Sequence, residues 1–156
     1  MHDKSKNMGN IFNDTDFHKI VNRIKYISKE DKRQWGQMSV EEMLAHCVTQ
    51  LRIALGEVTS QPQETLMMWT AIGKWVAFSD IPWPKGSNTP FEMNVKKSNI
   101  QIKSEGEEKE DLVHYLNLTR NSSQLSAHPF FGTLTKKEWG QLIYKHLDHH
   151  LKQFSQ

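Results

Sequence analysis

The sequence lacks several features that mark special classes of protein. Its 156 residues contain one cysteine, Cys47, so no internal disulfide can form, and a reducing, cytoplasmic location is expected. Eight glycines and five prolines are too few for a collagen-like or low-complexity chain. Lys and Arg number 20 against 18 Asp and Glu, and this balance gives no reason to expect nucleic acid or an anionic membrane as a partner.

Long apolar runs are also missing. The richest apolar run, residues 66–78, is too short to span a bilayer and contains Lys74. Residues 1–13 are polar, lack the apolar stretch of a signal peptide and are expected to form a flexible tail. Five Trp, seven Phe and seven Met still supply large side chains for a core, so we expect one soluble domain over residues 1–156.

The chain does contain clear helical periodicity. Apolar residues recur at helical spacing in four segments, residues 16–28, 39–56, 106–121 and 136–154. A shorter candidate helix lies at residues 64–78. Ser39 with Glu42 and Thr135 with Glu138 are capping-box pairs, which predict the beginning of two of these helices. No segment is a convincing strand, and residues 79–103 are expected to form an irregular connection.

The connections predict an all-α four-helix bundle. About ten residues separate the first helix from the second and the third from the fourth, so each pair can be antiparallel neighbours. About fifty residues separate the second helix from the third, which is enough for a connection that travels the full length of a bundle. We therefore expect one long crossover between these two helices, containing the short extra helix.

Histidine placement carries most of the functional argument. His146 and His150 lie one helical turn apart, a spacing at which two imidazoles can share a metal ion. A third ligand should come from a facing helix, and His46, in the middle of the second helix, is the best candidate. The apolar residues of the second helix form one stripe along it, and Cys47 lies near the middle of this stripe whereas His46 lies at its flank. A site at the edge of the core, open to a cleft, accommodates this position.

Plainer interpretations stay open for the same residues. Histidines at the end of a helix also favour the negative end of the helix dipole, and His149 is expected in solvent or as a donor to a ligand. Cys47 is expected to be a small buried apolar group, with a metal ligand or a reactive thiol as alternatives. His128, before Pro129, is expected in a turn and could line a cleft. The sequence has no phosphate-binding glycine loop, no Cys-x-x-Cys and no Gly-x-Ser-x-Gly.

Three stretches resemble the DinB-like (YfiT-like) superfamily of metal-binding four-helix proteins. Residues 35–47, WGQMSVEEMLAHC, are similar to the second helix of that superfamily, and residues 146–154, HLDHHLKQF, to its last helix. Residues 128–132, HPFFG, followed by Trp139-Gly140, resemble an uncharacterised branch. The similarity is strong over the second helix and the last thirty residues or so, and loose over residues 59–103.

The resemblance implies an up-down-down-up bundle with a divalent metal, often zinc or nickel, held by His46, His146 and His150. Characterised members of the superfamily include transferases and isomerases that use a low-molecular-weight thiol, and metal-dependent hydrolases. The long proline-containing crossover departs from the better-known members, so no particular substrate carries over.

Two functions follow as hypotheses. The first is a metal-dependent enzyme, in which three neutral imidazoles leave a coordination position for water, a thiol or a substrate oxygen. No residue is identified as catalytic, and only His149 and His128 stand out as candidates for a general base. The alternative is a non-catalytic metal-binding or structural module. We expect a small-molecule substrate and neither nucleic acid nor membrane as a partner, and a homodimer stays open.

Overall fold

The computed structural model describes residues 8–61, 71–86 and 91–156, and over this part of the chain it is all-helical. The helices are α1 (Asp14–Tyr26), α2 (Val40–Ala54), α3 (Ala71–Ala77), the 3-10 turn η1 (Phe91–Met93), α4 (Glu105–Asn121) and α5 (Lys136–Lys152). The described residues contain no strand, only an isolated bridge between His128 and Gly132. The all-α prediction is confirmed. The expected extra helix is observed as α3, and residues 64–70 of its predicted range fall outside the described residues.

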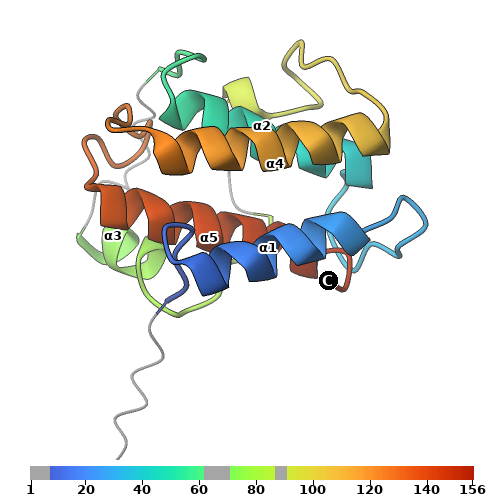
Figure 1. Cartoon of the computed structure of the whole chain (residues 1–156), viewed down its shortest axis with the longest axis horizontal. Helices are drawn as coiled ribbons and strands as arrows, with labels where there is room; N and C mark the ends of the chain where they lie inside the picture. Colours follow the sequence, from blue (N-terminus) through green and yellow to red (C-terminus); the bar gives the residue numbers. More distant parts are fainter. Residues whose placement is uncertain (1–7, 62–70, 87–90) are drawn as a thin grey trace, which may run out of the picture.

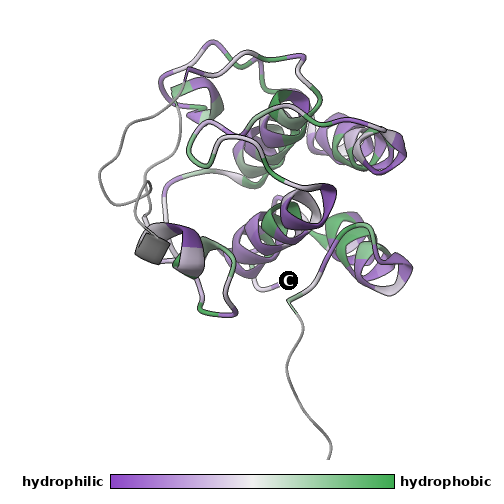
Figure 2. Cartoon of the chain, turned by 90° about the vertical axis from the view of Figure 1, so that its left-hand side faces the viewer, coloured by the Kyte–Doolittle hydropathy of each residue, from purple (hydrophilic) through white to green (hydrophobic). Residues whose placement is uncertain are grey.

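The four long helices form a bundle with up-down-down-up directions (Figure 1). α1 and α5 run one way along the bundle, and α2 and α4 run the other way. α2 packs against α4 and α5, and α1 packs against the same two helices. α1 and α2, and likewise α4 and α5, therefore lie across the diagonal from each other, as the end-on view shows (Figure 2). The sequence allowed α1–α2 and α4–α5 to be neighbours, but these are not the pairs that pack together. The long crossover joins α2 and α4, which are parallel neighbours, as a connection of that length allows.

Capping boxes begin three of the four long helices. The two pairs expected from the sequence, Ser39 with Glu42 and Thr135 with Glu138, are both formed. A third box, formed by Ser104 and Glu107, begins α4. In each box the hydroxyl accepts from a free backbone N–H while the glutamate accepts from the N–H of the cap residue, which contributes roughly 1 kcal/mol per helix.

The segment before α1 belongs to the folded domain. Residues 8–13 were expected to continue a flexible tail, but Ile11 is fully buried in the core. The Ile11 backbone N–H donates to the Gly140 carbonyl at 3.2 Å, and the Asn10 side chain donates to the Lys137 carbonyl. A Cβ on Gly140 would lie 2.0 Å from Asn10 Oδ1, so only glycine allows this close approach.

The two helical parts of the crossover that the structure describes, α3 and η1, lie against α5 and α2 respectively. Lys145 of α5 is buried, and its Nζ donates to the carbonyls at the end of α3, those of Val76 at 2.7 Å, Ala77 at 3.2 Å and Ser79 at 2.7 Å. Lys145 therefore fastens α3 to the bundle, with a cation at the negative end of that helix. No described helix is both long and apolar enough to cross a membrane.

Candidate metal centre

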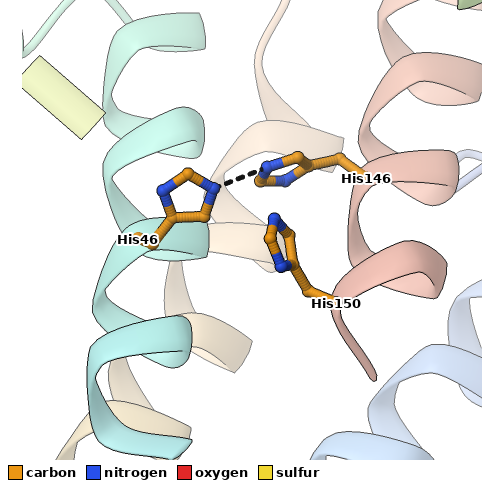
Figure 3. Close-up of side chains that lie close together, drawn as sticks. All are labelled: His46, His146 and His150. Atoms are coloured by element: carbon orange, nitrogen blue, oxygen red, sulfur yellow. Dashed lines mark hydrogen bonds between the residues drawn. The ribbon is translucent and has the colours of Figure 1, made fainter. Parts of the chain in front are cut away.

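Three histidine rings from two helices converge inside the bundle. His46 projects from the middle of α2, and His146 and His150 project from successive turns of α5 (Figure 3). The ring centroids lie 4.6–4.9 Å apart, and one ring nitrogen from each residue lies within 4.8 Å of the others. The structure thus brings together all three residues that the sequence predicted as ligands, in an arrangement that could hold a metal ion.

Outer hydrogen bonds orient two of the rings. His46 Nδ1 lies 2.8 Å from the Met93 carbonyl of η1, which can only accept, so Nδ1 carries the proton and Nε2 presents its lone pair. His150 Nδ1 lies 3.1 Å from Gln153 Oε1, and the same reasoning leaves His150 Nε2 free. Partners of this kind typically fix the tautomer and the orientation of histidines that bind metals.

His146 is the ring whose hydrogen bonding is incomplete. Its Nε2 lies 2.9 Å from His46 Nε2, and its Nδ1 is buried without a hydrogen-bond partner among the described residues. Two neutral imidazoles can share this contact only if one of them donates a proton to the other. His146 can donate an Nε2 proton to the His46 lone pair, and a cation bound by both nitrogens would take the place of that proton. The donor set therefore fits a metal ion, and especially one that favours nitrogen ligands.

Burial keeps the cluster uncharged at neutral pH. Burial lowers the pKa of His46 to about 4. The pKa values of His146 and His150 are also well below the usual range, first because of burial and then because neighbouring histidines disfavour an added charge. Neutral imidazole is the form that binds metal, so the cluster is in its ligating state at pH 7 without further deprotonation.

The crossover covers the flank of α2 on which His46 lies. His46 is 3% exposed and His146 is 5% exposed, whereas His150 is half-buried. η1 supplies the Met93 carbonyl to His46, and the Trp83 ring lies 6.0 Å from the His146 ring. The site is therefore at the edge of the helical core, as the position of His46 at the flank of the apolar stripe of its helix suggested. It is more deeply buried than the open cleft that we expected.

Cys47 lies outside the cluster. The residue is fully buried in the core, and its Sγ donates to Met43 Sδ at 3.7 Å. Burial raises the pKa of the thiol far above its usual range, so the thiolate form is strongly disfavoured. These features fit the small apolar core residue favoured by the sequence, and they do not fit a reactive thiol.

His149 lies beside the cluster and is not one of the three residues whose ring nitrogens converge. Its half-buried ring lies between Trp35, at 5.7 Å, and Trp83, at 6.2 Å, and 5.1 Å from the His150 ring. Burial lowers its pKa, and nearby lysine charges lower it further. His149 is therefore neither a fully solvated side chain nor a member of the triad.

His128 belongs to a partly buried aromatic turn. Its ring stacks on Phe131 at 4.9 Å and lies 5.2 Å from Trp139. Its Nδ1 accepts from the Phe130 backbone N–H at 3.1 Å, and burial lowers its pKa to about 3. The structural role expected from the sequence is therefore observed.

Four residues at the site were not found by sequence reasoning, and two of them come from a part of the chain without a periodic pattern. Met93 and Trp83 lie in the irregular connection, and Lys145 faces the crossover, whose path no pattern predicted. Gln153 did carry a signal, since it follows His150 by three positions and so shares its side of the helix.

Fold and site together define a four-helix bundle with a buried three-histidine cluster between α2 and α5. The chain belongs to the family described as "Protein of unknown function (DUF1569)", whose model matches residues 10–156. No curated protein and no solved structure matches the chain significantly.

Proposed function

We propose that His46, His146 and His150 bind a divalent transition-metal ion, zinc or nickel, and that the protein is a metal-dependent enzyme of the DinB-like superfamily. The observation that carries this proposal is the convergence of one ring nitrogen from each residue, within 4.8 Å of one another. The two stretches that resemble the superfamily most, residues 35–47 and 146–154, contain all three histidines.

The residues around the triad would prepare it for this role. The Met93 carbonyl and Gln153 Oε1 hold the outer protons of two rings, so that both Nε2 lone pairs are available before any ligand arrives. Burial keeps the three imidazoles neutral, and Met93 and Trp83 limit the access of water to them. A preformed neutral donor set of this kind spends little free energy on reorganisation when it binds an ion.

A divalent ion held by three neutral imidazoles supplies Lewis acidity at a remaining coordination position. We propose a small-molecule substrate, and either transfer from a low-molecular-weight thiol or hydrolysis as the reaction class. His149 is the better candidate for moving a proton, since its ring lies beside His150. His128 has Nδ1 already occupied by the Phe130 N–H, which leaves only its Nε2 for such a role.

Cobalt substitution tests the metal site directly. Metal-stripped protein titrated with Co²⁺ should develop visible absorption that saturates at about one equivalent, because nitrogen ligands in a low-coordinate site intensify these bands. His46→Ala should lose the signal, whereas His18→Ala, which removes an exposed histidine of α1, should keep it. Equal signals from the two variants would reject the site.

A structural role for the metal is the second candidate, and the burial of His46 and His146 favours it. An ion that only joins α2 to α5 should raise the unfolding temperature strongly and support no turnover. The enzyme hypothesis instead predicts turnover of an ester or a thiol-acceptor substrate by the metal-loaded protein, lost in His46→Ala. An activity panel run beside thermal unfolding separates the two functions.

A further inference from the structure

Two tryptophans, a lysine and a histidine surround the end of α5, directly next to the triad. We call Trp35, Trp83, Lys85 and His149 the rim. The His149 ring makes edge or tilted contacts with both tryptophan rings, and Lys85 Nζ lies 4.5 Å from the centre of the Trp35 ring. The two tryptophans are half-buried and Lys85 is exposed, so each tryptophan presents part of its surface to solvent.

Several contacts join the rim to the triad. Trp83 lies 6.0 Å from the His146 ring, and His149 lies 5.1 Å from the His150 ring. Gln153 donates through Nε2 to the Trp35 carbonyl at 2.8 Å, while its Oε1 holds His150. Because His150 is half-buried whereas the other two ligand rings are buried, the triad comes nearest to solvent on the side of the rim.

The charge around the rim is positive. Lys145 Nζ lies 5.5 Å from the Trp83 ring, and Lys85 lies over Trp35. Within the described parts of the chain, neither lysine has a carboxylate at ion-pair distance. The carboxylate of the same helical turn, Asp148, is already paired with Arg23 and Lys152, at 2.7 Å each. An anion approaching here therefore meets the exposed Lys85, which no acidic side chain of the described residues contacts directly. The buried Lys145, whose Nζ already donates to three carbonyls, adds positive charge nearby, partly offset by Asp80.

We propose that the rim binds a small organic carboxylate with a flat apolar body, and that such anions are the substrate class of the neighbouring metal centre. This inference rests on the proposed function, since the rim is taken as the approach to the metal. The exposed tryptophan surfaces provide apolar contact for the body of the molecule. Lys85 is free to pair with its carboxylate, because its contact with Trp35 occupies no hydrogen-bond donor.

Calorimetry with matched probes tests the proposal on the full chain. Phenylacetate carries the carboxylate and the flat body, and phenylacetamide has the same shape without the charge. Phenylacetate should bind up to about fivefold more tightly, the ratio expected for one partly exposed ion pair of about 1 kcal/mol. Lys85→Gln should remove most of this preference. Lys137→Gln makes the same charge change on the exposed first turn of α5 and should leave the preference intact.

The titrations should be done with both metal-stripped and zinc-loaded protein, so that the two proposals can fail separately. A charge preference that persists without metal supports the rim, even if the protein then proves to bind no zinc, which would reject the metal site alone. The rim is overturned by equal affinity for the two probes, by no measurable binding of either, or by an unchanged preference in Lys85→Gln, whatever the metal content.

Discussion

His46 and His146 lie 100 positions apart in the chain, yet their Nε2 atoms lie 2.9 Å apart between α2 and α5. The Met93 carbonyl fixes the proton of His46 on Nδ1, so its Nε2 directs a lone pair at His146. The contact thus needs either a proton or a cation between the rings. Because burial opposes an imidazolium here, the proton would be the one that a neutral His146 carries on Nε2, and a metal ion bound by both nitrogens would take its place.

Removing the outer partner of His150 should weaken metal binding without removing a ligand. Gln153→Leu deletes both the contact to His150 Nδ1 and the one to the Trp35 carbonyl. We expect zinc affinity to fall about tenfold or more, as for other outer partners of metal-binding histidines. Competition with a chromophoric chelator measures this. Gln141→Leu, a similar change five residues before His146 on α5, should have little effect, and equal losses in the two variants would contradict the role of Gln153.

The hydrogen bonds from Lys145 to the end of α3 should control how easily this part of the crossover separates from α5. Lys145→Met loses three hydrogen bonds to the carbonyls at the end of α3, while the aliphatic stem is largely retained. Stability should fall by roughly 1–3 kcal/mol, because those carbonyls lose their charged donor. Zinc release to a chelator should also accelerate, since Trp83 follows the same segment.

Lys145→Arg provides the matched control for this change. It keeps a cation and several donors, so release should lie between that of wild type and that of Lys145→Met. Zinc release at the wild-type rate in Lys145→Met would show that the hydrogen bonds of Lys145 do not keep the crossover over the site.

The stability of the metal-free protein should fall as the pH falls. His128 has a pKa of about 3 in the folded state against an ordinary value of 6.5, so the unfolded chain binds the proton more readily. This contribution is complete above pH 6.5 and is lost as the pH falls toward 3. Between pH 7 and pH 5 His128 alone should account for about 2 kcal/mol.

Urea unfolding of wild type and His128→Phe at both pH values measures this dependence. The free energy of unfolding of the variant should fall less between pH 7 and pH 5 than that of wild type, whatever its absolute value. The same slope in both proteins would show that His128 does not remain neutral in the fold.

Cys47 should be dispensable for metal binding. Cys47→Ala removes a buried thiol whose Sγ contacts Met43, so stability should fall by about 1 kcal/mol through lost packing. Metal stoichiometry should not change, because the thiol lies outside the triad. Loss of about one equivalent of zinc in this variant would identify Cys47 as a ligand after all.

The parts of the fold that depend on local pattern could be predicted from the sequence. Helical periodicity and the capping pairs at Ser39 and Thr135 located the long helices, and the four-residue spacing of His146 and His150 placed two rings on one face of α5. The choice of His46 as the third ligand required only the assumption that the helix containing it faces α5. These features are set by residues close together in the chain.

The features that sequence reasoning missed depend on contacts between distant segments. The diagonal placement of α1 with α2, and of α4 with α5, depends on how the connections cross the ends of the bundle. The burial of Ile11 depends on the absence of a side chain at Gly140, more than a hundred residues away. The depth of the site depends on the crossover, whose Met93 and Trp83 carry no periodic signal.

Elemental analysis of the purified protein beside two single-histidine variants tests the central claim most directly. Wild type and His114→Ala, which alters an exposed position on α4, should each carry close to one equivalent of a divalent transition metal. His146→Ala should lose most of it, because only two of the three ligands remain. Full metal content in His146→Ala, or none in wild type after loading with zinc, would contradict the account.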